Sequence, residues 1–77
     1  MDLNSKQKRV MVFIQEWCAT HQDPVPQFMI IYSLKSEIPE STIKSSLLAL
    51  KRKGYIRKAI NVKPVSFVKL RGVVIYN

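Results

Sequence analysis

The chain has 77 residues, of which 47% are hydrophobic and 23% charged, and its formal net charge is +8. This length allows one small domain (residues 1–77) with a single core and leaves no room for an enclosed catalytic cleft, so we expect no enzyme. No apolar run approaches the roughly 20 residues that span a bilayer. The N-terminus also lacks the charged-then-apolar order of a signal peptide, so we expect a cytoplasmic protein, associated with the nucleoid when bound to DNA.

Cys18 is the only cysteine and His21 the only histidine. An internal disulfide is therefore impossible, and two such residues are too few for a structural zinc site. The sequence contains no carboxylate pair, Cys/His arrangement or glycine-rich phosphate loop. It therefore predicts no metal, no cofactor and no catalytic residue.

The charge is divided unequally along the chain. Residues 1–40 contain all five acidic residues and four basic ones, whereas residues 41–77 contain nine basic residues and no acidic one. A half-chain without carboxylates presents a positive field to solvent, and counterion release would give it affinity for a polyanion. We expect nucleic acid as the partner. The alternatives are a merely soluble basic surface and, less favoured, an anionic membrane, because the basic residues are not on an amphipathic helix with an exposed apolar face.

The first predicted helix covers about residues 5–20, and either Asn4 or Ser5 can cap its start. Its apolar residues recur at helical spacing and predict one broad core-facing stripe of Val10, Phe13, Ile14, Trp17 and Cys18. The basic residues of its first turns oppose the helix dipole, so they are either incidental or contact phosphate: Lys6, Lys8 and Arg9. Residues 21–26, with two prolines, are interpreted as a connector.

A second helix is predicted over about residues 26–36, with Pro26 near its first position. It has two apolar faces, where a surface helix needs one: Ile30, Ile31 and Leu34 on one side, and Phe28, Met29 and Tyr32 nearly opposite. Either the first helix or the C-terminal strands cover the second face, or it is a partner or dimer surface.

The third predicted helix covers about residues 39–53 and follows the second after a short turn, which is the spacing of a helix-turn-helix. Pro39 opens it, and Gly54 ends it after a cluster of three basic residues. Apolar and polar residues separate onto two faces: Ile43, Leu47 and Leu50 on one, and Ser41, Lys44, Ser45 and Leu48 on the other. This pattern is typical of a recognition helix.

After Gly54 the apolar period changes from 3.6 to 2, which predicts two strands over about residues 55–60 and 65–70. A hairpin with Lys58 and Lys63 at its tip and flanks follows, and residues 73–76 form a possible extra strand that invites pairing with another chain through Val74 and Tyr76. The predicted fold class is α+β, with three helices and a basic β-hairpin in the order of a winged helix-turn-helix.

The stretch T-I-K-S-S-L-L-A-L-K-R-K-G-Y-I, from Thr42 to Ile56, resembles the Thr-Val-x-x-x-Leu-x-x-Leu-x-x-x-Gly-x-Ile motif of bacterial winged helix-turn-helix regulators. Among these, the DNA-binding domain of LexA-type repressors is most similar, over roughly residues 3–70. The resemblance implies operator DNA as ligand and the third helix in the major groove. Ser41, Thr42, Lys44 and Ser45 match the groove-facing positions, and Pro39 and Glu40 match the helix start. The glycine usual in the preceding turn is replaced, and the self-cleaving domain has no counterpart in these residues, so we expect no cleavage-driven switch.

Our leading hypothesis is a sequence-specific regulator of transcription, a repressor, that binds double-stranded DNA as a homodimer; its small size suits a phage or plasmid. The residues expected to read bases are Glu40, Ser41, Thr42, Lys44 and Ser45. Those expected on the DNA backbone are Lys51, Arg52, Lys53, Arg57, Lys58 and Lys63. The alternatives are a winged helix that contacts a protein co-regulator through Phe28, Met29 and Tyr32, and a non-specific or replication-type nucleic-acid binder.

Overall fold

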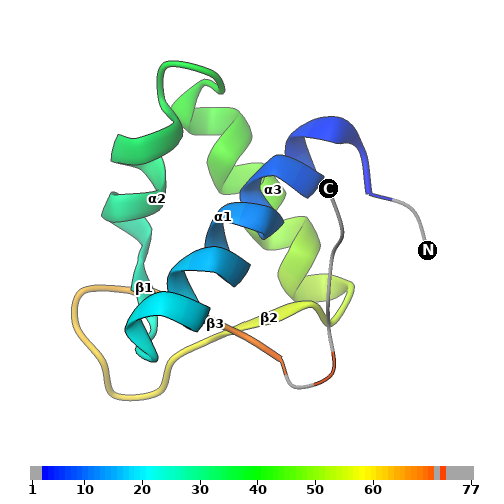
Figure 1. Ribbon diagram of the computed structural model, residues 1–77. Helices are drawn as coiled ribbons and strands as arrows, with labels where there is room; N and C mark the ends of the chain where they lie inside the picture. The colour runs from blue at the N-terminus through cyan, green and yellow to red at the C-terminus, as the bar shows by residue number, and fades with distance from the viewer. Residues whose placement is uncertain (1–2, 71, 73–77) are drawn as a thin grey trace.

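Three helices and three short strands make up residues 3–70 and 72, the part of the chain that this computed structural model describes. In chain order they are α1 (Ser5–His21), β1 (Val25–Pro26), α2 (Gln27–Leu34), α3 (Glu40–Arg52), β2 (Ile56–Lys58) and β3 (Ser66–Lys69). The strands form an antiparallel sheet in the order β1-β3-β2, which lies across one end of the three helices (Figure 1). The predicted α+β class is confirmed, and this order of helices and terminal hairpin is that of a winged helix.

Both ends of α1 are capped by its own sequence. The Asn4 side chain accepts a hydrogen bond from the Gln7 backbone N–H at 2.7 Å, and the Gln7 side chain accepts one from the Asn4 N–H at 3.2 Å. This reciprocal pair is a capping box, which satisfies two otherwise unpaired amides of the first turn. At the other end Gln22 adopts a left-handed conformation and donates to the Cys18 carbonyl. Asn4 is thus the cap, and α1 extends one residue beyond the predicted helix.

The interpretation of residues 21–26 as a plain connector is wrong, because they contain strand β1. Val25 is paired with Phe67 and Pro26 with Ser66 of β3, and the Gln27 N–H donates to the Val65 carbonyl at 2.8 Å. A proline is tolerated here because β1 is the edge of the described sheet, where a missing amide breaks no central ladder. Val25 is fully buried. A strand of two residues has no alternation to detect, so the pattern could not predict it.

The turn between α2 and α3 sets the angle of the helix-turn-helix. The helix α2 is shorter than predicted at both ends, since Pro26 is extended and the chain leaves the helix after Leu34. The Glu37 and Ile38 N–H groups both donate to the Leu34 carbonyl, at 2.9 and 2.8 Å. Ile38 is buried in the core. Pro39 follows directly and is the N-cap residue of α3.

Helix α3 ends where the sequence predicted. Gly54 has a φ of +84°, a conformation that glycine adopts without the steric cost of a Cβ. It allows the Tyr55 N–H to donate back to the Leu50 carbonyl at 3.0 Å, which closes the last turn. Strand β2 begins at Ile56, so only a short turn separates α3 from the hairpin.

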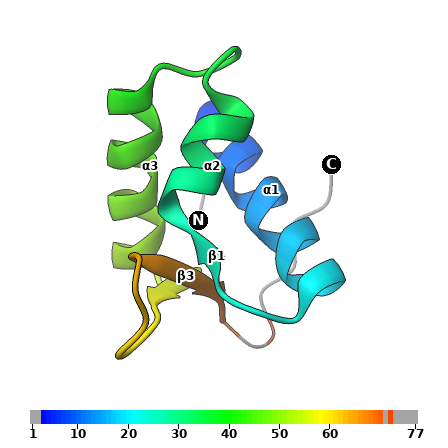
Figure 2. The ribbon, with the colours of Figure 1, turned by 90° about the vertical axis from the view of Figure 1, so that its left-hand side faces the viewer.

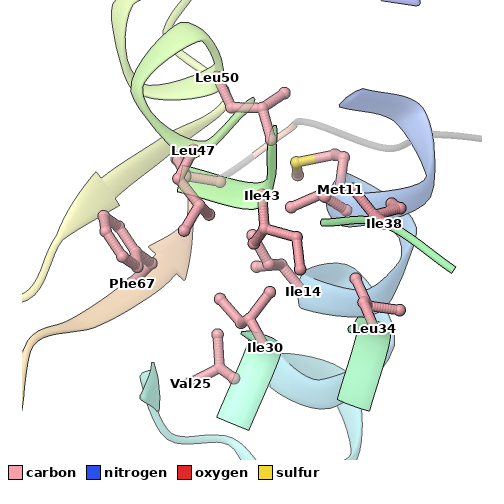
Figure 3. Packing of buried hydrophobic residues seen from close by; sticks show 12 residues of the cluster. Met11, Ile14, Val25, Ile30, Leu34, Ile38, Ile43, Leu47, Leu50 and Phe67 are labelled. Carbon is pink, nitrogen blue, oxygen red and sulfur yellow. The ribbon is translucent and has the colours of Figure 1, made fainter. Parts of the chain in front are cut away.

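The core lies between the three helices and one face of the sheet (Figure 3). Ile43, Leu47 and Leu50 of α3 are buried as predicted. The central residues of α1 are Val10, Met11 and Ile14, while the predicted Phe13, Trp17 and Cys18 are only partly buried at the edge of the cluster. Further buried side chains come from α2, the turn and the sheet: Val25, Ile30, Leu34, Ile38, Ile56 and Phe67. Because these residues bury the inner face of α3, its opposite face is exposed to solvent.

The hairpin strands are shorter than predicted, and the loop between them is longer. The register pairs Ile56 with Lys69 and Lys58 with Phe67, and residues 59–65 form the loop. Ile60, predicted as the end of a strand, is 76% exposed in this loop. The extra strand predicted over residues 73–76 lies outside the described residues. Within the part described, no helix is long and apolar enough to cross a membrane.

Candidate nucleic-acid interface

The outer face of α3 is polar and open. Because Ile43, Leu47 and Leu50 point into the core, residues on the opposite side of the helix project into solvent. The exposed side chains include Glu40, Ser41, Lys44, Ser45, Leu48, Lys51 and Arg52. In Figure 2, α3 runs along the left edge of the molecule, and the loop between β2 and β3 extends below it. The outer face of α3 and the hairpin loop thus lie on the same side of the domain.

Lys44 and Glu40 are paired on this face. Lys44 Nζ lies 3.1 Å from Glu40 Oε2, one helical turn away, and both side chains are more than half exposed, at 54% and 59%. Exposed pairs of this spacing contribute only about 0.3–0.5 kcal/mol. The pair therefore orients the lysine without preventing it from donating to another acceptor. Ser45 donates through Oγ to the Thr42 carbonyl at 3.1 Å and retains its acceptor capacity.

Two of the predicted DNA contacts lie away from the centre of this face. Thr42 is half-buried on the flank of α3. Lys53 is also half-buried, and its Nζ donates to the Gln7 side chain of α1 at 3.4 Å. That contact holds the C-terminal end of α3 against the start of α1. Lys53 is thus engaged within the fold.

The remaining predicted backbone contacts are exposed cations of α3, β2 and the hairpin loop, and this set is named the cationic band. Lys51 and Arg52 are exposed in the last turn of α3. In β2 the side chain of Ile56 is buried while Arg57 and Lys58 are exposed, and Lys63 is exposed in the hairpin loop. No carboxylate occurs anywhere in residues 41–77, so Glu40 is the nearest acidic group in the sequence to this band. Such an arrangement is chemically suited to neutralising phosphate groups.

Sequence reasoning gave no role to several exposed apolar residues beside these cations. Leu48 is 45% exposed in the middle of the polar face of α3. Ile60, Val62 and Val65 are exposed in the hairpin loop. The helical pattern had already placed Leu48 on the polar side of α3, and this position was the signal from which its exposure could have been predicted. Ile60 and Val65 were predicted as strand residues, so their exposure could not be predicted from alternation, whereas Val62 lies between the two predicted strands.

The second apolar face of α2 is open to solvent. Phe28 is 57% exposed and Tyr32 70% exposed, whereas Met29 is half-buried against the core. The alternative in which α1 or the described strands cover this face is therefore wrong for the two aromatic residues. A groove of about 610 Å³ follows them toward the start of α3, and Lys35 Nζ lies 5.1 Å from the centre of the Tyr32 ring. Val74 and Tyr76, predicted for the same surface, lie outside the described residues.

Among the described residues no group of histidine, cysteine or acidic side chains could hold a metal ion. The fold is a winged-helix-like α+β arrangement, and exposed cations lie on α3, on β2 and in the hairpin loop. Comparison of the chain with protein-family models, with curated proteins and with solved structures found no match.

Proposed function

We propose that this protein is a sequence-specific double-stranded DNA-binding regulator of the winged-helix class, similar in mode to LexA-type repressors and acting as a repressor. The observation that carries the proposal is the outer face of α3, where hydroxyl and lysine side chains are exposed beside a carboxylate-free cationic band. An α-helix fits the major groove of B-DNA, and base edges there can be distinguished by hydrogen bonding.

The contacts divide into two kinds. Ser41, Lys44 and Ser45 lie on the exposed N-terminal half of α3, from which recognition helices usually contact base edges. Lys51, Arg52, Arg57, Lys58 and Lys63 lie farther along the cationic band, where they would bind phosphates and hold the register of α3 in the groove. The two sets are connected through Gly54 and Tyr55, which join α3 to β2.

Selection of bound duplexes from a random double-stranded DNA pool tests this function. We expect the pool to converge on a shared sequence, and we expect a scrambled duplex of the same composition to bind at least about 10³-fold more weakly, as for other specific binders. Binding to all duplexes with equal affinity would instead identify a non-specific binder. No retention of duplex DNA at low salt would contradict both.

A second candidate function is contact with a protein, and the exposed aromatic residues of α2 favour it. Phe28 and Tyr32 lie beside a groove that ends at Lys35 and Glu40. Monomeric proteins rarely leave such apolar groups together without a partner, and the first partner to test is a second copy, which would give the homodimer common among DNA-binding regulators. Association that persists in high salt while duplex binding is absent would favour this function over the first.

A further inference from the structure

A small hollow adjoins the outer face of α3. Its volume is about 270 Å³, and it lies between α3, the first residue of α2 and strand β3, lined by Gln27, Lys44, Leu47, Leu48, Lys51 and Phe67. Leu47 and Phe67 are buried residues of the core and give the hollow an apolar floor; both are labelled in Figure 3. The half-exposed Leu48 forms an apolar wall, and Lys44 and Lys51 stand on the rim.

The spacing on α3 places an apolar group next to a cation. Leu48 follows Lys44 by four residues and precedes Lys51 by three, so all three share one side of the helix. Leu48 also continues the row that starts at Ser41, seven residues earlier. At 1.5 Å per residue this row covers about 10 Å, or roughly three base-pair steps of B-DNA.

Of the four bases, thymine best matches this combination. In the major groove thymine presents its C5-methyl group beside the O4 acceptor, so one edge needs an apolar contact and a hydrogen-bond donor together. Guanine would satisfy a lysine through O6 and N7 but offers nothing to a leucine. Cytosine presents an amino donor, which a lysine cannot accept, and adenine presents an amino donor beside N7.

We propose that this hollow is a thymine-reading subsite, in which the Leu48 side chain packs on the C5-methyl group and the ammonium of Lys44 donates to O4. The inference rests on the proposed function, because it requires α3 in the major groove. It adds the identity of one base and assigns its recognition to a residue outside the predicted set. Leu48 is then a specificity-determining residue, and its exposure on a polar helix face is functional.

Single-atom changes in the DNA test the subsite. In the duplex selected from the random pool, each thymine is replaced in turn by uracil, which removes only the methyl group. We expect one position, about three base pairs from the base that Ser41 contacts, to lose about four-fold in affinity, the factor expected for one buried methyl group. Where cytosine is placed at this position, 5-methylcytosine should bind better than cytosine by a similar factor, since it restores the methyl group without O4.

Protein variants connect the effect to the hollow. In Leu48→Ala the duplexes with thymine and uracil at that position should bind equally well, whereas Ile60→Ala, a matched loss of an exposed apolar side chain outside the hollow, should retain the difference. Circular dichroism establishes that both variants remain folded. If no thymine-to-uracil replacement weakens binding although specific binding is intact, the thymine subsite is overturned and the proposed function is not. The same holds if the effect of the methyl group persists in Leu48→Ala. Failure to bind any duplex would overturn the proposed function and this inference with it.

Discussion

Arg9 of α1 and Glu37 of the turn between α2 and α3 form a two-pronged ion pair across 28 residues of sequence. Arg9 Nε lies 3.1 Å from Glu37 Oε1, and its Nη2 lies 3.3 Å from Oε2. The sequence left open whether Arg9 contacts phosphate or carries an incidental charge. The structure gives it a third role, since it ties the helix-turn-helix turn to the first helix and is neutralised by Glu37.

We expect this pair to stabilise the fold only slightly. The two side chains are 41% and 50% exposed, and such pairs are typically worth about 0.2–1 kcal/mol because water screens them. A double-mutant cycle of Arg9→Ala and Glu37→Ala, measured by urea unfolding, should give a coupling energy in this range that shrinks in about 1 M salt. A coupling energy well above this range would show that the pair fixes the turn more strongly than its exposure implies.

Two leucines of α3 should differ sharply in their effect on stability. Leu50 is fully buried in the core and Leu48 is half-exposed. Leu50→Ala should lower the free energy of unfolding by about 2–5 kcal/mol, because it removes buried methyl groups and leaves a cavity. Leu48→Ala should change it by no more than about 0.5 kcal/mol, as is usual for surface positions. Similar losses in the two variants would contradict the assignment of the faces of α3.

Lys63 in the hairpin loop should contribute to DNA affinity without contributing to specificity. Its ammonium is exposed, and it lies far along the sequence from the residues of α3 that are proposed to read bases. Lys63→Ala should weaken binding to selected and scrambled duplexes by the same factor, and it should reduce the slope of log K against log salt by about 0.9, the value for one phosphate contact. An unchanged salt slope would place Lys63 outside the interface.

The exposed face of α2 should support self-association. In a Phe28→Ser, Tyr32→Ser double variant the free energy of unfolding should remain within about 1 kcal/mol of the original, because both side chains are largely exposed. Sedimentation equilibrium should show a concentration-dependent dimer for the original protein and a monomer for the double variant. A dimer that survives both substitutions would place the dimer contact elsewhere.

The sequence predicted the three helices and the hairpin because their signals are local and strong. Ile43, Leu47 and Leu50 repeat at helical spacing, and Gly54 marks the end of α3, where it is needed for a positive φ. Strand β1 could not be predicted, because Val25 and Pro26 become a strand only through pairing with Phe67 and Ser66, which are 42 and 40 positions away. In α1 the sequence predicted Phe13 as a core residue, but Met11 is the one that is fully buried. Which of the two faces the core depends on how the neighbouring helices pack against α1.

The site was predictable to the extent that it follows from the periodicity of α3. The pattern correctly placed Ser41, Lys44 and Ser45 on the outer face. It could not show that Lys53 reaches Gln7 of α1, or that Leu47 and Phe67 form the floor of a hollow, because both depend on contacts between distant segments. The exposure of Tyr32 also required the structure, since a second apolar face is equally compatible with burial.

The most direct test of the account is the effect of Lys44→Ala on discrimination between DNA sequences. Lys44 lies on the open face of α3, held only by a weak pair with Glu40, so its loss should not disturb the fold. If α3 reads base edges, the affinity for the selected duplex should fall by about 1–3 kcal/mol while the affinity for a scrambled duplex falls much less, so that the ratio of the two dissociation constants shrinks. An equal loss on both duplexes would contradict base reading by α3.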